Sequence, residues 1–417
     1  MSIIGVDAVE AVAASGRLTL ARGDRLTPLA SDRAAELGIE IVAIVDAATA
    51  PAAASAPAAQ GGGAIPRIRL EGPGALPTPP VPALFRRGAP FPGLRGREHA
   101  APASGRVKRV TVVGAGNVGT HAAMRLAETD LIDEIVLVDV VEGLARGVAL
   151  DLTHAAGLLG FGSRIRGEGS IEAAGASEYT IITAGRPRQP GMSRTDLTAT
   201  NAAIVGDLAA AVGRVSPDGV ILVVTNPLDE MTELAWRRSK LPETRVLGMA
   251  GLLDSARFHA LAGLAADARA DSVSGIALGS HGDEMVFPSS QARIGADAAA
   301  RRLGERFGPT VERARNSGAE VVGLLGKGSA FVTPGLAAAR MVERMIRADG
   351  AVLSATVRPH GEYGISDVYV GLPVRLGRRG VAEIVTLGLD AAEAASLRDA
   401  AEKIRARIGA LPAVAGS

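Results

Sequence analysis

Apolar runs alternate with helical patterns from about residue 106 onward. The stretches RVTVVGAG, EIVLVDV, YTIITAG, GVILVVTNP and RVLGMAG are typical of buried strands, and NVGTHAAMRLAETD and EGLARGVALDLTHAA are typical of helices. Strands that alternate with helices predict a parallel sheet covered by helices. We therefore expect a doubly wound α/β domain over residues 106–250.

The pattern becomes mixed after residue 250. Long helical stretches over residues 333–348 and 390–408 stand among short strand-like segments. This mixture predicts an α+β catalytic or substrate domain over residues 251–413.

The first 48 residues have the pattern of a small folded module. In TPLASDRAAELGIEIVAIV, Thr27 is suited to cap a helix, Pro28 to its first turn and Gly38 to its end. A strand-like run follows from Ile39. We expect a small N-terminal α/β extension over residues 1–48.

Residues 49–105 are rich in proline, alanine and glycine and contain about half of the chain's 23 prolines. This composition does not form a packed core and predicts a disordered linker. The alternative is a docking segment, with the stretch LFRRGAPF as its contact.

Composition narrows the function classes. Aromatic residues make up 3% of the chain and the formal net charge is +1, with both signs mixed along it. We therefore expect no nucleic-acid partner. The chain has no cysteine, which excludes thiolate metal sites and a cysteine nucleophile, and we expect no metal. No signal peptide and no apolar run of roughly 18–20 residues stands in the sequence. We expect a cytoplasmic protein without membrane contact.

A glycine motif follows the first strand of the α/β pattern. Gly114, Gly116 and Gly119 form G-x-G-x-x-G directly after RVTVV, and Asn117 and Val118 open the next helix. The glycines permit a tight turn, close approach of a pyrophosphate and close helix packing. This context predicts a Rossmann-type dinucleotide site.

Asp139 stands twenty residues after Gly119, at the end of the strand EIVLVD. A carboxylate there accepts hydrogen bonds from a ribose hydroxyl and repels a 2′-phosphate, so we expect NAD as the cofactor.

Acid–base candidates lie in three further motifs. GSHGDEM contains His281, LLDSARF contains Asp254 and Arg257, and VVTNP contains Asn226. Histidine exchanges a proton near neutral pH, and a buried carboxylate on its far nitrogen fixes the tautomer. Each residue alone also has a structural explanation, and we take His154 as structural.

Several motifs in order resemble the lactate/malate dehydrogenase family, and most closely the lactate-dehydrogenase-like malate dehydrogenases. They are VVGAGNVG, VDVVEG, ALDLTHA, TAGRPRQPGMSRTDL, VVTNPLD, GLLDSARF, GSHGDEMV, LLGKGSA and GEYGISDVYVGLPV. The resemblance covers residues 107–412, and the N-terminal hundred residues lie outside it.

The resemblance implies roles for matching residues. His281 is the expected proton donor and acceptor with Asp254 as its partner, and Arg257 binds the C1 carboxylate of the substrate. Arg194 in PGMSR polarises the reacting carbonyl. The resemblance also places Asn226 at the substrate and nicotinamide, and Asn201 at the cofactor ribose.

The loop GRPRQPGMSR carries the expected substrate specificity. In the family, the position of Arg188 faces the distal group of the substrate, so a second arginine implies a dicarboxylate, malate or oxaloacetate. Gln189 departs from the lysine common in malate enzymes, and we expect no substrate role for Arg186. The alternatives are a lactate or other 2-hydroxy acid dehydrogenase, and an inactive scaffold with the same fold.

Two expectations concern assembly. The family forms homodimers and homotetramers, and we expect one of these. RLTPLASDRAAELGIEIV resembles short elements in proteins of bacterial microcompartments, which implies a docking partner for the extension and a place inside such a shell. The alternative is an appendage for oligomerisation or solubility.

Overall fold

The protein forms two compact units, Met1–Pro80 and Val81–Ser417. The computed structural model describes residues 3–4, 6–13, 15–20, 25–26, 30, 33–34, 36–43, 105–186, 194–282, 284–326 and 328–411. The predicted linker over residues 49–105 lies outside the described residues except for its last position. Thr27 and Pro28, the predicted helix start, also lie outside them.

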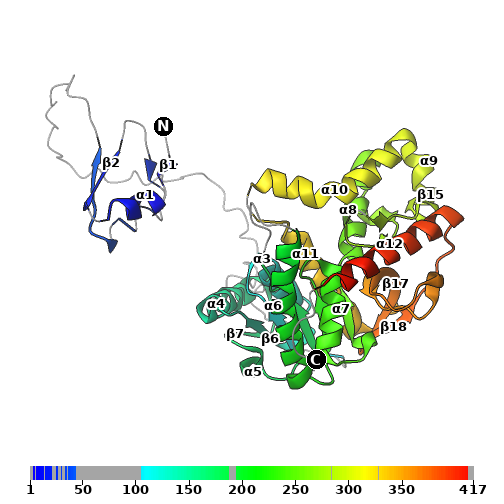
Figure 1. The fold of residues 1–417 in the computed structure, drawn as a ribbon, viewed down its shortest axis with the longest axis horizontal. Helices are drawn as coiled ribbons and strands as arrows, with labels where there is room; N and C mark the ends of the chain where they lie inside the picture. Colours follow the sequence, from blue (N-terminus) through cyan, green and yellow to red (C-terminus); the bar gives the residue numbers. More distant parts are fainter. Residues whose placement is uncertain are drawn as a thin grey trace, which may run out of the picture. The chain divides into compact units, whose positions relative to one another are not determined.

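The first unit is a small α/β piece (Figure 1). Its elements are β1 (Ile3–Ile4), α1 (Val6–Ala11), β2 (Arg17–Leu20), β3 (Arg25–Leu26) and β4 (Glu40–Ala43). β1 pairs with β3 and β2 with β4, both in parallel. The described residues of the predicted helix, Ala30, Arg33, Ala34 and Glu36, are helical, Gly38 after them has φ +64°, and β4 follows as the predicted strand.

The second unit is built on a sheet whose first half is parallel. Its parallel strands are β5 (Val107–Val113), β6 (Ile132–Val138), β7 (Arg164–Glu168), β8 (Tyr179–Ile182), β9 (Val220–Val223) and β10 (Val246–Gly248). Their spatial order is β7-β6-β5-β8-β9-β10. β5 therefore lies between β6 and β8, where the strand order reverses. Ligands of such sheets bind at the carboxyl ends of the strands at this point.

Helices cover both faces of the parallel strands. They are α3 (Asn117–Glu128), α4 (Glu142–Leu159), α5 (Ile171–Ala174), α6 (Arg194–Val215) and α7 (Leu228–Ser239). Adjacent strand residues belong to different buried clusters: Ile181 packs with α3 and α4, and Ile182 with α5, α6 and α7. Burial on both faces explains why the strands are apolar runs without alternation.

The second half of this unit extends the same sheet with antiparallel strands. Its helices are α8 (Gly251–Ala266), α9 (Ala299–Leu303), α10 (Phe307–Leu325), α11 (Val332–Arg347) and α12 (Ala391–Gly409). Five strands continue the sheet: β12 (Leu278–Gly279), β13 (Met285–Val286), β16 (Val352–Val357), β17 (Val370–Gly377) and β18 (Gly380–Ile384). Three others form a separate antiparallel sheet: β11 (Val273–Ser274), β14 (Arg293–Ile294) and β15 (Asp297–Ala298). β16 pairs with β10 in antiparallel fashion. The predicted long helices are confirmed as α11 and α12.

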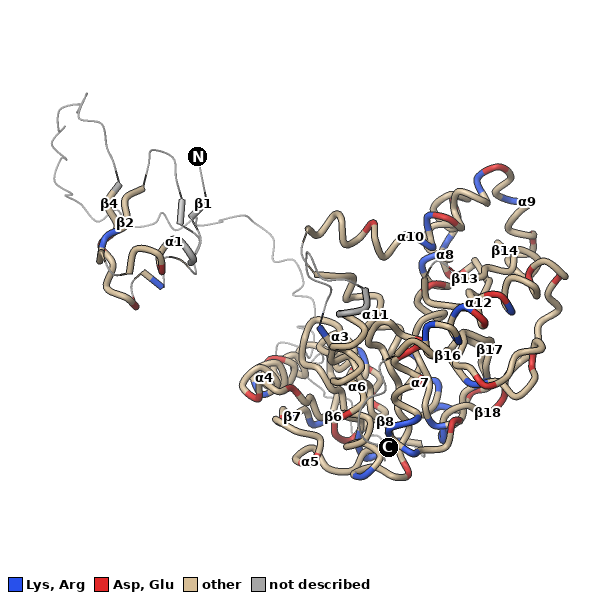
Figure 2. The backbone as a smooth tube through the Cα atoms, viewed as in Figure 1, with Lys and Arg blue, Asp and Glu red and all other residues tan. Residues whose placement is uncertain are grey.

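Short 3₁₀ helices connect several of these elements. They are η3 (Glu243–Arg245), η4 (Ala270–Ser272), η5 (Ser289–Gln291), η6 (Gly304–Arg306) and η7 (Glu362–Gly364). Basic and acidic residues are interspersed along the described backbone (Figure 2). Among the described residues, no helix has both the length and the apolar character needed to cross a membrane.

Candidate active site

The glycine turn joins β5 to α3 and leaves the amino end of that helix without a side-chain cap. Gly114 has φ +104°, and a Cβ there would come within 2.6 Å of Thr183 Oγ1. A Cβ on Gly119 would lie 1.9 Å from the Gly114 carbonyl oxygen, so α3 packs this closely only because Gly119 has no side chain. Gly116 is the N-cap residue. The uncapped N–H groups that follow it, from Asn117 and Val118 onward, favour an anion.

Asp139 follows β6 and lies beside this turn. Its Oδ2 accepts a hydrogen bond from the Ala115 backbone N–H at 2.9 Å, and its Oδ1 accepts one from the Val141 N–H at 3.0 Å. These bonds fix the carboxylate at the carboxyl end of the strand. Each oxygen keeps a lone pair that can accept a ribose hydroxyl.

A cavity of about 850 Å³ extends from the glycine turn. Gly114, Gly116, Asn117, Val118, Gly119 and Asp139 line it, together with the apolar residues Val138, Leu144, Ile171 and Leu208. It thus combines uncapped N–H groups for a pyrophosphate, a carboxylate for a ribose and an apolar wall for a base. These residues fit a dinucleotide.

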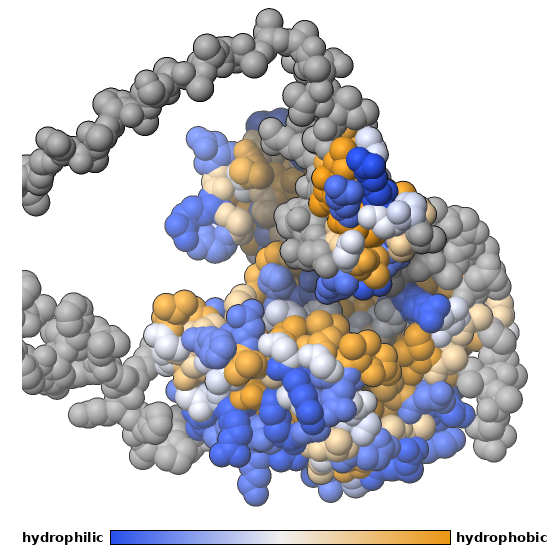
Figure 3. Space-filling model, turned by 90° about the vertical axis from the view of Figure 1, so that its left-hand side faces the viewer, coloured by the Kyte–Doolittle hydropathy of each residue, from blue (hydrophilic) through white to orange (hydrophobic). Residues whose placement is uncertain are grey.

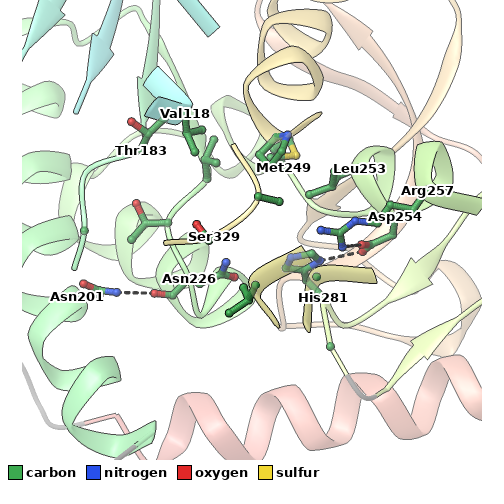
Figure 4. Close-up of a pocket in the computed structure, with 18 of the residues that line it drawn as sticks. Val118, Thr183, Asn201, Asn226, Met249, Leu253, Asp254, Arg257, His281 and Ser329 are labelled. Atoms are coloured by element: carbon green, nitrogen blue, oxygen red, sulfur yellow. Dashed lines mark hydrogen bonds and ion pairs between the residues drawn. The ribbon is translucent and has the colours of Figure 1, made fainter. Parts of the chain in front are cut away.

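A second cavity of about 440 Å³ adjoins the first, since both are lined by Val118, Thr183 and Ser329. Asn201 and Asn226 line it on one side, and Asp254, Arg257 and His281 on the other (Figure 4). Ser329 and Ala330 also line it. The parallel half and the antiparallel half of the sheet therefore both contribute to one pocket.

The Asp254 carboxylate holds two groups of this pocket at once. His281 Nδ1 lies 2.8 Å from Asp254 Oδ2, and Arg257 Nη1 donates to Asp254 Oδ1 at 3.0 Å. Asp254 is 4% exposed, so solvent screens these pairs little. Because the carboxylate takes Nδ1, the imidazole leaves Nε2 for a substrate (Figure 4).

The pKa of His281 is raised above its ordinary value. Burial alone disfavours the imidazolium, but the charge of Asp254 and its hydrogen bond outweigh that cost. Arg257 opposes the shift, and Asp229 adds to it. A histidine with this environment keeps its proton to higher pH and can donate it near neutrality.

Asn201 is buried and ties two loops of the pocket together. Its side-chain oxygen accepts from the Arg186 backbone N–H at 2.8 Å. Its Nδ2 donates to the Asn226 carbonyl oxygen at 2.7 Å and to that of Arg186 at 3.2 Å. In this geometry Asn201 positions the backbone of Asn226, and its contact with the cofactor ribose stays a prediction.

The loop with the expected specificity residue is largely outside the described part of the chain. Arg188 and Gln189 lie there. Arg194 is the first residue of α6, and its backbone alone is described. Arg186 is exposed, and both cavities reach it.

The sequence analysis missed two features of the pocket wall formed by α10. Arg315 lines the pocket, and its Nη2 donates to the Met285 carbonyl oxygen at 3.0 Å. A Cβ on Gly318 would lie 3.5 Å from Arg257 Nη2, so α10 packs against that guanidinium. No sequence pattern separates Arg315 from Arg313, the other arginine of this helix.

Two family descriptions match most of the chain. Residues 108–248 match the lactate/malate dehydrogenase NAD binding domain, and residues 252–413 match the lactate/malate dehydrogenase alpha/beta C-terminal domain. Both matches lie in the unit that contains the two cavities.

Similar proteins cover the same part of the chain. A malate dehydrogenase of Trichormus variabilis is 42% identical over 307 residues, which are 73% of this chain and 94% of that protein. A malate dehydrogenase of Salinibacter ruber is 39% identical over 301 residues, 72% of this chain and 96% of that protein.

Solved structures of malate and lactate dehydrogenases match the same part of the chain. The malate dehydrogenase of Salinibacter ruber matches with a TM-score of 0.69 at 37% identity, over 72% of this chain and 96% of that one. The lactate dehydrogenase of Cryptosporidium parvum, complexed with lactic acid and the nicotinamide cofactor, matches with a TM-score of 0.70 at 30% identity, over 74% of this chain and 99% of that one. The chain therefore belongs to the lactate/malate dehydrogenase family, as an oxidoreductase with NAD as its cofactor.

Proposed function

We propose that this protein is an NAD-dependent malate dehydrogenase, which oxidises malate to oxaloacetate reversibly. The observation that carries the proposal is the set of His281, Asp254 and Arg257, joined through one buried carboxylate in a pocket beside the dinucleotide cavity. The similar proteins named malate dehydrogenase support the choice of substrate.

In this proposal His281 is the acid and base of the reaction. Its Nε2 accepts the proton of the C2 hydroxyl during oxidation and returns a proton to the carbonyl oxygen during reduction. Asp254 stabilises the imidazolium that forms and keeps Nδ1 protonated. When bound, NAD supplies the nicotinamide carbon that takes the hydride from C2.

The remaining side chains hold and polarise the substrate. Arg257 has a planar fork with one N–H on Asp254, and its other N–H groups can bind the C1 carboxylate. Arg194 is assigned to the reacting oxygen, where a cation stabilises developing alkoxide charge. Asn226 is assigned a hydrogen bond to the substrate.

Arg188 is assigned to the second carboxylate of the substrate. Pyruvate would leave this guanidinium desolvated and unpaired, at a cost of roughly 2–5 kcal/mol. Such a cost corresponds to discrimination by a factor of about 30 to several thousand. Gln189 lowers the local positive charge beside it and affects affinity rather than the substrate class.

The test is NADH oxidation with oxaloacetate and with pyruvate, for the wild type and for Arg188→Gln. We expect the wild type to prefer oxaloacetate by orders of magnitude and the substitution to reduce that preference. A wild type that uses pyruvate as well as oxaloacetate would overturn the malate assignment and favour a lactate dehydrogenase. Turnover of neither acid would favour a different 2-hydroxy acid or the inactive scaffold.

The homodimer or homotetramer stays a prediction of the sequence. Hydrophobic side chains are exposed on α4, including Leu158 at 89% and Leu150 at 57%. Figure 3 shows hydrophobic surface among hydrophilic surface on the face it presents. Large exposed apolar side chains are often covered by a partner. Sedimentation of the full chain at several concentrations tests this prediction.

The docking role of residues 1–48 also stays a proposal. Removal of residues 1–105 removes none of the described residues that line the two cavities. We expect the shortened enzyme to keep its turnover with NADH and to lose its place inside a bacterial microcompartment. A loss of turnover would instead assign the extension a role in catalysis or assembly.

A further inference from the structure

A second buried carboxylate lies behind the acid–base histidine. Asp229 stands in the first turn of α7 and is 2% exposed. Its Oδ2 accepts a hydrogen bond from Ser280 Oγ at 2.9 Å and one from the His281 backbone N–H at 3.2 Å. Its Oδ1 accepts one from Thr356 Oγ1 at 3.1 Å. Asp229 therefore contacts the main chain of His281, whereas Asp254 contacts its ring.

Asp229 also lies three residues after Asn226. Asn226 lines the pocket on the side opposite His281. The Asn226 carbonyl oxygen is held by Asn201, and α7 begins at Leu228. One carboxylate thus connects the segment that carries Asn226 with the segment that carries His281. These two segments come from opposite halves of the sheet.

The C-terminal helix supports the same contact. Arg407 of α12 donates from Nη2 to Ser280 Oγ at 2.9 Å. Its other nitrogens pair with Glu230 at 2.7 Å and with Glu284 at 3.1 Å. Because Ser280 accepts from Arg407, its hydroxyl proton is directed to Asp229. The chain Arg407, Ser280, Asp229 therefore fixes the loop before His281.

We propose that Asp229 is a positioning residue that holds His281 and Asn226 in register across the pocket. The inference rests on the proposed function, because it assumes that His281 exchanges a proton with a substrate bound near Asn226. Asp229 is not among the described residues that line the two cavities, and it acts through the backbone of His281.

The charges around Asp229 give the proposal a second readout. Glu230 on α7 and Arg407 on α12 face it, and Asp254 and Arg257 on α8 face His281 from the other side. The negative charge of Asp229 contributes to the raised pKa of His281. Removing that charge without removing the hydrogen bonds should lower the pKa of His281.

Three substitutions separate the positioning role of Asp229 from the effect of its charge. Asp229→Ala removes the acceptor, and Asp229→Asn keeps an oxygen for Ser280 and His281 while its amide group donates to Thr356 Oγ1. Ser280→Ala removes one bond of the same chain. Thr232→Val is the matched control, since Thr232 is fully buried on α7 and its hydroxyl bonds only the Leu228 carbonyl oxygen, at 2.8 Å, among the contacts described.

We expect Asp229→Ala to lower kcat by roughly ten- to a hundredfold with an unchanged KM for NADH, because small misplacements of reacting groups carry such a cost. Asp229→Asn should restore most of the lost kcat, and Thr232→Val should stay within about twofold of the wild type. Equal kcat in Asp229→Ala and Thr232→Val, or no rescue by Asp229→Asn, would overturn the proposal. If Asp229→Ala does not fold, an unchanged kcat in Ser280→Ala overturns it, and a lowered one supports it.

The effect of the Asp229 charge on the pKa of His281 is measured by NMR titration of ¹⁵N-labelled histidine in the full chain. This measurement does not depend on turnover. The chain has six histidines, and His281→Asn identifies the signal of His281. We expect a lower pKa for His281 in Asp229→Asn than in the wild type, and an equal pKa would contradict the contact. A wild type without turnover of either 2-oxo acid would contradict the proposed function and leave this titration valid.

Discussion

His281 Nδ1 lies 2.8 Å from one oxygen of Asp254, and Arg257 donates to the other oxygen at 3.0 Å. One buried carboxylate therefore orients both the proposed acid–base group and the proposed carboxylate anchor. Because α8 carries both Asp254 and Arg257, one helix positions the proposed anchor and the carboxylate that orients His281.

Asp254→Asn should lower kcat/KM by about 10²- to 10⁴-fold, the range typical of acid–base groups. The substitution removes the charge that raises the pKa of His281. Reduction of the 2-oxo acid needs protonated His281, so its rate falls as pH rises through that pKa. We expect this fall at lower pH in Asp254→Asn than in the wild type, in pH profiles of kcat/KM. An unchanged profile would contradict the pairing.

Arg257→Lys should raise KM for the 2-oxo acid by roughly ten- to a hundredfold, since lysine keeps the charge but loses the planar fork. The control is Arg313→Lys, on the exposed face of α10. Arg313 makes a two-pronged contact with Glu320, at 3.0 and 2.7 Å. Steady-state kinetics should show no change in this control. The anchor role is wrong if both variants behave alike.

Asp139→Ser should weaken the preference for NADH over NADPH by about tenfold or more, because the carboxylate that repels a 2′-phosphate is gone. The Asp139 contacts to Ala115 and Val141 also place the turn, so kcat/KM with NADH should fall as well. Initial rates with both cofactors measure the ratio. A ratio equal to that of the wild type would show that Asp139 does not face the ribose.

The stability of the fold should depend on pH through the ionisation of Asp229. Burial, and then Glu230, raise the pKa of Asp229 from its ordinary value of 3.8 to about 6. In the unfolded chain the group ionises near pH 4, so between about pH 4 and 6 the folded state binds more protons. The contribution of Asp229 to the free energy of unfolding is therefore fully present below this pH window. It falls by about 3 kcal/mol as pH rises through the window.

Asp229→Asn cannot ionise and should lack this loss. Urea unfolding at pH 4.5 and 7.5 should show the variant gaining stability relative to the wild type at the higher pH. The difference between Thr232→Val and the wild type should be the same at both values. A pH-independent difference for Asp229→Asn would mean that its pKa in the fold is ordinary.

The sequence predicts the parallel half of the fold well because its signals are local. Each buried strand is an apolar run, and Gly114 and Gly119 have requirements that no other residue meets in that turn. The continuation of the sheet from β10 into β16 has no such signal. It depends on the pairing of Gly248 with Thr356, more than a hundred residues apart.

The candidate site also combines residues that local motifs predict with contacts that only the fold creates. His281, Asp254, Arg257 and Asn226 stand in motifs, and the structure brings all four to one pocket. Asp229 stands in the same motif as Asn226, but only the fold shows that its carboxylate reaches the backbone of His281.

The most direct test of the account is His281→Asn, measured for NADH binding and for turnover in parallel. The ring lies in the substrate pocket and outside the dinucleotide cavity lining. We predict an unchanged Kd for NADH in fluorescence titration and a loss of kcat of about 10²- to 10⁴-fold. A variant that binds NADH and still reduces oxaloacetate at the wild-type rate would contradict the role of His281 as the proton donor.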